Sequence, residues 1–337
     1  MALVDIQDLS THYASEGGTV RAVNDFDMAV TEGDIVGIVG ESGCGKTTLA
    51  RTILQLLPSN ASTPNGRIMF KDADLLSMKA RQFNKSIRWN EISYIPQTAM
   101  DALDPIETIF TQFKRMVRPH ETRNDFRADA EAAMQSVGLD PSRLDDYPHE
   151  LSGGMKQRVM IAFAFELSPS LVIADEPTTA LDVITQDEIL HQIETFSHRF
   201  ETSVLVITHD LAVVAETCDK VGVMYGGELV EFGPTDEVFG RPAHPYTMGL
   251  VNADPDIGKV DTEIVSIPGL PPRLTEPVTG CTFYDRCPFG TEECLDPVPE
   301  LAVDGGDRMA KCVRVDEHET LFEESKHPET WEGTTSE

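Results

Sequence analysis

The sequence predicts an α/β fold in which a parallel β-sheet carries a phosphate-binding loop, with a second, smaller module behind it. Three short apolar runs, at 34–40, 171–175 and 203–207, have the length and composition of strands buried on both faces. A glycine-rich stretch follows the first run and leads into a helical pattern. At 337 residues the chain is long enough for a full α/β core and a further module.

The glycine-rich stretch 40–48 reads Gly-Glu-Ser-Gly-Cys-Gly-Lys-Thr-Thr and fits the pattern G-x-x-x-x-G-K-[ST]. Its glycines let successive N–H groups point to one place at a helix N-terminus, which favours an anion. We expect Lys46 to reach the outer phosphates of a nucleotide and Thr47 to offer its hydroxyl to Mg²⁺. A glycine-rich turn that binds nothing is the alternative, and the flanking strand and helix disfavour it. The predicted binding residues are Gly40, Ser42, Gly43, Gly45, Lys46, Thr47 and Thr48.

The chain is strongly acidic, with 57 acidic and 27 basic side chains and a formal net charge of −30. This balance argues against nucleic-acid binding and against docking on anionic lipid by charge alone. The acidic side chains repel one another, and this repulsion becomes tolerable at molar salt, where the screening length falls to about 3 Å. We therefore expect adaptation to a salt-rich cytoplasm; an acidic protein from an ordinary cell is the alternative. No apolar run reaches bilayer length and the first residues lack a signal-peptide pattern, so we expect a cytoplasmic protein.

The N-terminal region predicts an antiparallel β subdomain. Residues 3–9 alternate apolar and polar side chains, and residues 20–23 and 26–30 are strand-like beyond a Gly-Gly turn. Tyr13 is expected in the loop between these strands, where its ring can stack on a purine; a tyrosine that packs on its own hairpin is nearly as consistent. Residues 67–70 predict a further strand.

The middle of the chain changes from strand to helix. Residues 91–97 predict a strand that ends at Gln97, whose amide can meet a metal-bound water. From about 98 to 150 the pattern is helical, most clearly at 126–137, which indicates a helical insertion in a nucleotide domain.

A second anion site is expected at the start of the next helix. Ser152 is a natural N-cap, and Gly153 and Gly154 allow close backbone approach. An ordinary capped helix is the alternative.

Polar side chains follow two further strands. Asp175 and Glu176 end a buried strand, at the edge where open parallel sheets bind ligands. Asp175 can hold Mg²⁺ through water, and Glu176 can take the proton from an attacking water, a role worth roughly 10²–10⁴ in rate. His209 reaches the same edge and can donate to a terminal phosphate. Asp182 opens the following helix, and residues 221–233 predict a hairpin.

This ordered set of motifs resembles the ATP-binding subunit of ABC transporters. The resemblance covers roughly residues 1–240, with a helical signature subdomain at about 98–168. It implies a P-loop NTPase core and a head-to-tail dimer, in which Ser152, Gly153 and Gly154 of one subunit cover ATP bound to the phosphate loop of the other. The motifs that carry it are the phosphate loop, Gln97, Leu-Ser-Gly-Gly-Met-Lys-Gln at 151–157, Asp-Glu-Pro at 175–177, Ala-Leu-Asp at 180–182 and His209.

The resemblance also implies roles for individual residues. Glu176, His209 and Gln97 are the implied catalytic residues, with Glu176 as general base and His209 as sensor of the γ-phosphate. Asp182 belongs to the implied nucleotide site, and Cys44 is given no function. The remaining roles are Tyr13 for adenine stacking, Lys46 for phosphates, and Thr47, Gln97 and Asp175 for Mg²⁺ and its waters.

Residues 241–318 indicate which group of ABC transporter ATPases the chain resembles. The stretches 241–250, 267–272 and 280–288 are similar to the C-terminal extension of oligopeptide and dipeptide importer ATPases, a group that includes nickel importers. This implies ATP-driven import of di- or oligopeptides at the cytoplasmic face of the membrane. The implied partners are two membrane permease subunits, a second, paralogous ATPase subunit and an extracytoplasmic binding protein. A nickel or other small-solute importer, and a soluble regulatory metalloprotein, are the alternatives.

Four cysteines with the spacing C-x5-C-x6-C-x17-C lie in this extension: Cys281, Cys287, Cys294 and Cys312. A cytosolic chain does not keep disulfides, so a metal site is the better account. The gaps are longer than in zinc knuckles. A [4Fe–4S] cluster, which the similar extension of some peptide importers carries, is therefore preferred to Zn²⁺. Residues 319–337 are acidic and rich in Glu, Thr and Ser, which predicts a disordered tail.

Overall fold

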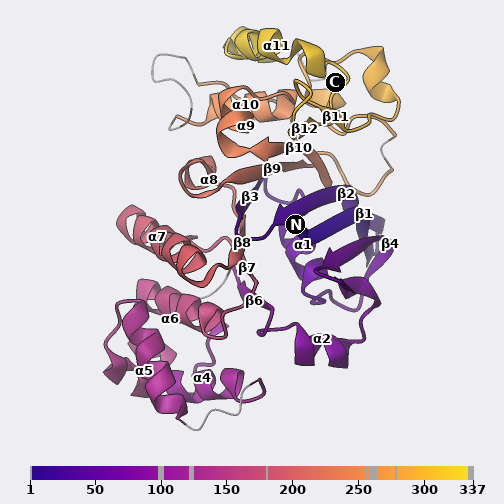
Figure 1. Cartoon of the computed structure of the whole chain (residues 1–337). Coiled ribbons are helices and arrows are strands. Elements are labelled where there is room, and N and C mark those ends of the chain that lie inside the picture. The colour runs from indigo at the N-terminus through magenta and orange to yellow at the C-terminus, as the bar shows by residue number, and fades with distance from the viewer. Residues whose placement is uncertain are drawn as a thin grey trace. The chain divides into compact units, whose positions relative to one another are not determined.

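The structure is a computed structural model of the chain, and it describes residues 2–97, 102–120, 125–179, 181–255, 257, 264–277 and 279–332 (Figure 1). The chain divides into two compact units. The first consists of Thr31–Ile35 and Ser77–Ile207. The second consists of Ala2–Val30, Val36–Leu76 and Thr208–Glu337.

The first unit contains three parallel strands, β6, β7 and β8. Ile92 of β6 pairs with Leu171 of β7, which pairs in turn with Ser203 of β8. All residues of β7 and β8 are buried, as expected for apolar strands covered on both faces. The helices and strands of this unit are α2 (Ala80–Ser86), β6 (Ile92–Ile95), α4 (Ile109–Val117), α5 (Phe126–Ser136), α6 (Gly153–Phe165), β7 (Leu171–Asp175), α7 (Val183–Phe200) and β8 (Ser203–Ile207), with the 3₁₀ turns η2 (Pro141–Asp145) and η3 (Pro148–Glu150).

The helical region expected from about 98 to 150 is confirmed for its described part, where α4 and α5 lie close to α6 (Figure 1). Local sequence explains where the helices begin. Thr108, Asp125, Ser152 and Asp182 are the N-caps of α4, α5, α6 and α7, and the side chain of each accepts a backbone N–H three residues on. The predicted cap Ser152 is thus in place.

The second unit contains two groups of strands. In one, the order is β2-β1-β4-β5, with β1 and β4 antiparallel. In the other, β3 pairs in parallel with β9, and β10 pairs antiparallel with both β9 and β12. The expected hairpin is present, because Gly226 and Gly227 both have positive φ, +59° and +87°, in the two-residue turn from β9 to β10.

The elements of this unit are β1 (Ala2–Ser15), β2 (Gly18–Thr31), β3 (Ile35–Val39), α1 (Lys46–Ile53), β4 (Ala61–Phe70), β5 (Ala73–Asp74), η1 (Leu75–Ser77), α8 (Leu211–Thr217), β9 (Lys220–Tyr225), β10 (Glu228–Pro234), α9 (Thr235–Gly240), α10 (Pro245–Ala253), η4 (Tyr284–Arg286), η5 (Glu292–Leu295), β11 (Leu301–Ala302), β12 (Met309–Ala310), η6 (Val315–Glu317), α11 (His318–Ser325) and α12 (Pro328–Trp331). Tyr13 lies inside β1 and pairs with Ala61, so its expected place in a loop is wrong. The strand is longer than its alternating apolar pattern suggests, because pairing with β4 continues past the shift in register near Ser10.

The disordered tail expected over 319–337 is also wrong for the residues up to 332. Helix α11 lies beside α10 (Figure 1), and its Leu321 packs in one cluster with Met248 and Phe289. Trp331 of α12 is 3% exposed, and its Nε1 donates to the Ser325 carbonyl at 2.8 Å. A few apolar side chains therefore anchor an otherwise acidic segment.

Candidate active site

The phosphate loop between β3 and α1 is held close to neighbouring backbone by its glycines. Gly40 has φ +151°, and a Cβ there would stand 2.1 Å from the Met224 carbonyl oxygen. Gly45 has φ +111°, and its Cβ would stand 2.0 Å from the Ala22 carbonyl oxygen. Both positions exclude any other residue without movement of backbone. Ser42 and Gly43 lie exposed between them.

Lys46 is the first residue of α1 and folds back over the loop. Its Nζ donates to the carbonyl oxygens of Gly40 at 2.6 Å and of Glu41 at 3.0 Å, and the residue is 6% exposed. Gly45, the N-cap of α1, has no side chain with which to accept an N–H of the first turn. A cation and a helix N-terminus therefore occur together at this loop, as the sequence predicts for a phosphate site.

Two further predicted residues lie by the loop in the second unit. The Tyr13 hydroxyl is 3.3 Å from the Thr48 Oγ1, so its ring stands at the start of α1. The Thr208 N–H donates to the Ile38 carbonyl at 3.1 Å, which puts the exposed His209 next to the strand that leads into the loop.

The predicted carboxylates of the first unit lie at the end of β7. Asp175 is fully buried and its Oδ2 accepts the hydroxyl of Tyr94 at 3.1 Å. The Glu176 Oε2 accepts from the Gln97 amide at 2.9 Å and from the Thr179 hydroxyl at 2.8 Å. The structure thus brings Gln97 to Glu176, two residues that the sequence singled out separately. Tyr94 and Thr179 were missed; Thr179, three residues after Glu176 in a turn, is the one that local spacing could have signalled.

The backbone at Glu176 is unusual. Its φ is +48°, a left-handed conformation that costs a non-glycine residue about 1–2 kcal/mol. Its N–H donates to the Ile207 carbonyl at 2.7 Å, which fixes the residue between β7 and β8. A strained residue that is held by backbone and side-chain bonds is typical of a functional position.

The residues of the expected second anion site lie at the start of α6. Ser152 Oγ accepts the Met155 N–H at 3.3 Å, and a Cβ on Gly154 would stand 2.9 Å from the Thr185 Cγ2. Asp182 accepts the backbone N–H of Thr185 at 3.0 Å and its hydroxyl at 2.8 Å, and these bonds lower the pKa of Asp182. The starts of α6 and α7 therefore meet, and only a small residue fits at 154. Ala180 lies outside the described residues.

The predicted residues divide between the two units. Gln97, Ser152, Gly153, Gly154, Asp175, Glu176 and Asp182 belong to the first unit. Tyr13, His209 and the phosphate loop from Gly40 to Thr48, with Thr47 half-buried, belong to the second.

The four cysteines of the extension line one pocket of the second unit, together with apolar side chains and His244. Burial raises the pKa of Cys281 to about 12 and that of Cys312 to about 11, and it raises the pKa of Cys287 as well. The backbone N–H groups two residues on, at Phe283, Phe289 and Arg314, lower the pKa of these three thiols and so oppose part of the rise. Among the described residues no group of three or more His, Cys, Asp or Glu side chains is arranged to hold a metal ion.

Comparison with known proteins shows which family the chain belongs to. Residues 23–179 match the model of the ABC transporter family, and residues 230–294 match that of the oligopeptide/dipeptide transporter C-terminal region. A probable peptide ABC transporter ATP-binding protein of Sinorhizobium fredii is 44% identical over 94% of this chain and 96% of its own length. The chain belongs to the ATP-binding subunits of the oligopeptide and dipeptide ABC transporter family. The protein is accordingly an ATPase.

Other members and solved structures agree with this membership. The oligopeptide transport ATP-binding protein OppD of Salmonella typhimurium is 39% identical, and the match covers 93% of each chain. A solved dimeric ATP-binding cassette bound to ADP and Pi shares the fold, with TM-score 0.62, 24% identity, and coverage of 69% of this chain and 98% of that one. In the described part of this family member, no helix is long and apolar enough to cross a membrane.

Proposed function

We propose that this ATPase drives uptake of di- or oligopeptides through a membrane permease, from the cytoplasmic face of the membrane. The observation that carries the proposal is the match to a peptide transporter subunit over 94% of the chain, extension included. Its partners are two permease subunits, a second, paralogous ATPase subunit and an extracytoplasmic binding protein. A nickel or other small-solute importer is the alternative.

We assign the chemistry to residues as follows. Lys46 and the loop amides bind the phosphates, Tyr13 stacks on adenine, and His209 senses the γ-phosphate. Thr47, Gln97 and Asp175 serve Mg²⁺ and its waters. Glu176 accepts the proton of the attacking water, and its bonds to Gln97 and Thr179 support this role because they aim the carboxylate.

A head-to-tail dimer supplies the rest of the nucleotide site in this proposal. Ser152, Gly153 and Gly154 of one subunit cover ATP on the phosphate loop of the other, and Asp182 stands nearby. The cap at Ser152 supports this, since it leaves the glycines at the positive end of the 13-residue α6 helix.

The catalytic assignment is tested with Glu176→Gln, which keeps the size and the hydrogen bonds of the side chain but removes its basicity. ATP should still bind, and hydrolysis should fall at least about 100-fold. Glu188→Gln is the matched control, because this exposed carboxylate of the same unit pairs with Arg158. A Glu176→Gln enzyme that hydrolyses ATP as fast as the control would contradict the assignment.

The transport assignment is tested in proteoliposomes that contain the permease pair and the second ATPase subunit. Uptake of a labelled dipeptide should require Mg-ATP and should be lost with Glu176→Gln. Uptake of Ni²⁺ without uptake of peptide would select the alternative.

We also propose that the cysteine pocket holds a [4Fe–4S] cluster, with Zn²⁺ as the alternative; because the described side chains are not arranged to hold a metal ion, the four cysteines would have to draw together around either group. Four thiols in one pocket support this, and backbone N–H groups oppose part of the rise that burial causes in the pKa of three of them. A bound cluster would cross-link the extension. Anaerobically purified protein should contain iron and absorb at roughly 400 nm. Cys287→Ser should remove both the iron and the absorbance. Cys218→Ser should remove neither, because Cys218 is a buried cysteine outside the pocket. Protein that contains zinc and no iron would select the alternative.

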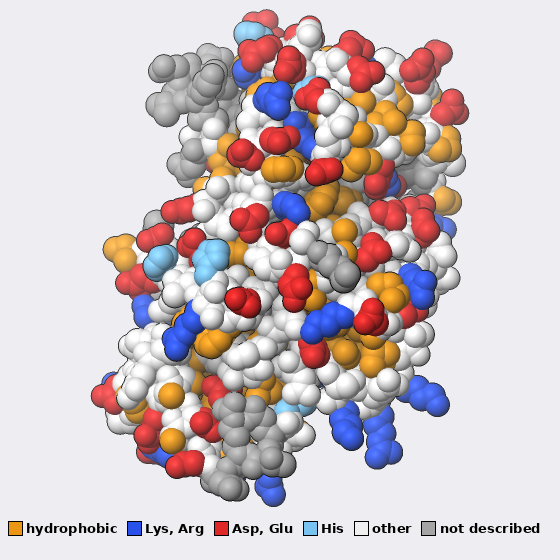
Figure 2. Space-filling view, viewed as in Figure 1, with side chains coloured by type: hydrophobic (Ala, Val, Ile, Leu, Met, Phe, Trp, Pro, Cys, Tyr) orange, Lys and Arg blue, Asp and Glu red, His pale blue; other side chains and the backbone are white. Residues whose placement is uncertain are grey.

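Adaptation to a salt-rich cytoplasm is a further part of the proposal. Its support is the net charge of −30 and the spread of Asp and Glu side chains over the face drawn in Figure 2. Charges distributed in this way repel one another less when salt screens them.

A further inference from the structure

Arg286, which lies in the extension directly before Cys287, reaches the phosphate loop. Its Nη1 and Nη2 donate to the two carboxylate oxygens of Glu41, each at 2.9 Å. Glu41 is the residue after Gly40, at the entrance of the loop. A paired, fork-shaped contact of this kind is the strongest that a guanidinium makes with a carboxylate.

The guanidinium of Arg286 is fully satisfied where it lies. Its side chain is 7% exposed, and each of its five N–H groups has an acceptor. The remaining three donors go to the Pro268 carbonyl at 2.7 Å, the Tyr225 hydroxyl at 3.1 Å and the Ile267 carbonyl at 3.5 Å. A long, flexible side chain has thus been fixed in one position, which is the arrangement expected of a residue that orients another.

An aromatic cluster supports the same contact. Arg286 lies over the rings of Tyr225 and Phe283, at 5.6 and 5.9 Å from their centroids. Tyr246 of α10 packs against both rings, and its hydroxyl accepts the backbone N–H of Glu41 at 2.9 Å. Two residues from the far end of the sequence therefore hold one residue of the loop, by its N–H and by its carboxylate.

The third polar group of Glu41 faces the nucleotide-binding lysine, because its carbonyl oxygen accepts from Lys46 Nζ. The N–H, the carbonyl and the carboxylate of Glu41 are thus all hydrogen-bonded, and these bonds hold the loop backbone next to Gly40. The pair also matters for charge. A carboxylate at the entrance of a phosphate site repels phosphates unless a cation neutralises it, and Arg286 is that cation.

We propose that Arg286 is a positioning residue of the ATPase: through Glu41 it holds the phosphate loop in its binding conformation and cancels the negative charge of the Glu41 carboxylate. The extension then contributes to nucleotide binding and is not only an appended module. This inference rests on the proposed phosphate site of the loop.

The test is ADP binding to the purified full chain, measured by titration calorimetry. Arg286→Gln should raise the Kd for ADP at least about tenfold, because a partly buried carboxylate is left uncompensated. The ratio of variant to wild-type Kd should shrink between low and molar KCl, where charge repulsion is screened. Glu41→Gln alone should weaken ADP binding less than Arg286→Gln does, since its amide oxygen still accepts from Arg286 and no negative charge remains on the side chain.

The double variant Arg286→Gln/Glu41→Gln decides between the proposal and a merely structural role. Its Kd should lie between those of wild type and Arg286→Gln, because the repelling charge is gone but Arg286 no longer holds the loop at Glu41. A double variant as weak as Arg286→Gln would overturn the proposal, and so would a wild-type Kd in Arg286→Gln. Should Arg286→Gln not fold, Arg286→Lys replaces it: an unchanged Kd there overturns the positioning role, and an intermediate one supports it.

Two controls complete the design. Arg314→Gln changes an arginine that, like Arg286, lies near a pocket cysteine, but its bonds go to Glu317 and Phe289, and its Kd should be unchanged. Lys46→Ala should abolish ADP binding. If Lys46→Ala binds ADP normally, the proposed phosphate site is wrong; if it does not and Arg286→Gln binds normally, only the role of Arg286 is wrong.

Discussion

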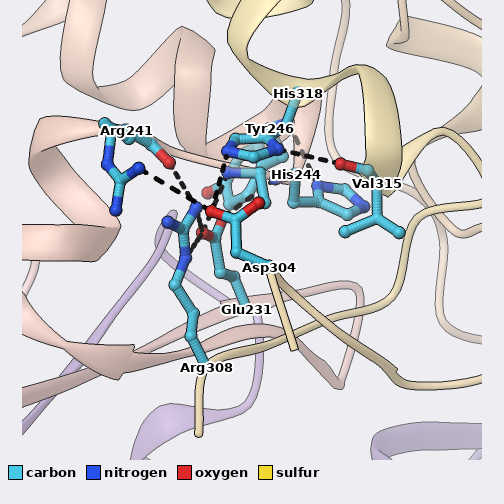
Figure 3. A network of polar contacts seen from close by, with 9 residues as sticks. Glu231, Arg241, His244, Tyr246, Asp304, Arg308, Val315 and His318 are labelled. Atoms are coloured by element: carbon cyan, nitrogen blue, oxygen red, sulfur yellow. Dashed lines mark hydrogen bonds and ion pairs between the residues drawn. The ribbon is translucent and has the colours of Figure 1, made fainter. Parts of the chain in front are cut away.

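Replacement of Arg308 by methionine tests what fastens the extension to β10 within the second unit. Arg308 is 2% exposed, and its Nε and Nη2 donate to Glu231 Oε1 at 3.1 and 2.8 Å (Figure 3). Glu231, in β10, also accepts the backbone N–H groups of Ala243 and His244, each at 2.9 Å. Nη2 of Arg308 further donates to the Arg241 carbonyl. One carboxylate thus joins β10, the chain before α10, and the residue before β12.

Removal of the arginine should be costly, because Glu231 is then a buried charge without a counter-charge. Broken buried pairs of this kind lose about 3–5 kcal/mol, and two backbone N–H bonds do not replace a guanidinium. A loss of this size lowers a melting temperature by on the order of 10 °C in a unit of 150–250 residues. The double variant Glu231→Gln/Arg308→Met should recover part of the loss, since no charge then remains buried.

The loss should also depend on pH. Burial raises the pKa of Glu231 above its ordinary value of 4.5, and the charge of Arg308 opposes that rise. Without Arg308 the folded-state pKa rises further, so the folded protein binds a proton over a range in which the unfolded chain does not. Stability is then greatest below the ordinary pKa and falls as pH rises through the folded one. We expect a smaller loss at about pH 5.5 than at about pH 7.5.

Urea unfolding of the full chain, followed by circular dichroism at both pH values, measures these differences. Arg127→Met is the control, because Arg127 makes an equally well-formed double contact with Asp145 in the first unit, but with 37% and 68% of the two side chains exposed. It should lose far less stability. Equal losses in the two variants, or a loss in Arg308→Met that grows toward acid pH, would refute the reasoning.

Three further outcomes are expected. Gly45→Ala should weaken ADP binding at least about tenfold, since φ at Gly45 is +111° and the new Cβ meets the Ala22 carbonyl. Gly17→Ala, with open space around it, should leave the Kd unchanged. Equal Kd values for the two variants in titration calorimetry would contradict this argument. Trp331→Ala should lower the free energy of unfolding in urea by about 3–5 kcal/mol, and Glu329→Ala should leave it nearly unchanged. The melting temperature of the wild type should rise between low salt and molar KCl; a flat or falling temperature contradicts the proposed salt adaptation.

The sequence was sufficient where a feature depends on neighbouring residues. The phosphate loop, the buried strands β7 and β8, and the caps Ser152 and Asp182 each follow from a pattern of fewer than ten residues, and the structure contains all of them. Local physics fixes these features: glycine permits a positive φ, a hydroxyl or carboxylate caps a helix, and a continuous apolar run needs cover on both faces.

The average composition of a segment gave a wrong prediction where a few buried side chains determine its structure. The tail is acidic as a whole, yet Leu321 and Trp331 bury themselves against α10 and anchor the helices that carry them. An average over the segment counts each apolar residue once, whereas the free energy depends on how much surface that residue buries. Tyr13 shows the complementary error, because its place in a strand is decided by a partner strand some 50 residues away.

The contact between Arg286 and Glu41 is beyond any sequence pattern, because 245 positions separate its partners. The motif around Tyr246 and the stretch around Cys287 could be matched to a family extension without a hint that both touch the phosphate loop. The bonds explain why these residues belong together: one fixes the Glu41 N–H, the other its carboxylate, and the aromatic rings between them exclude water. Removal of the extension would therefore expose a charge at the entrance of the loop and free the backbone beside Gly40. A chain shortened before Arg286 should bind ADP as weakly as Arg286→Gln, and Glu41→Gln should partly restore its affinity, an outcome that loss of an independent module does not produce.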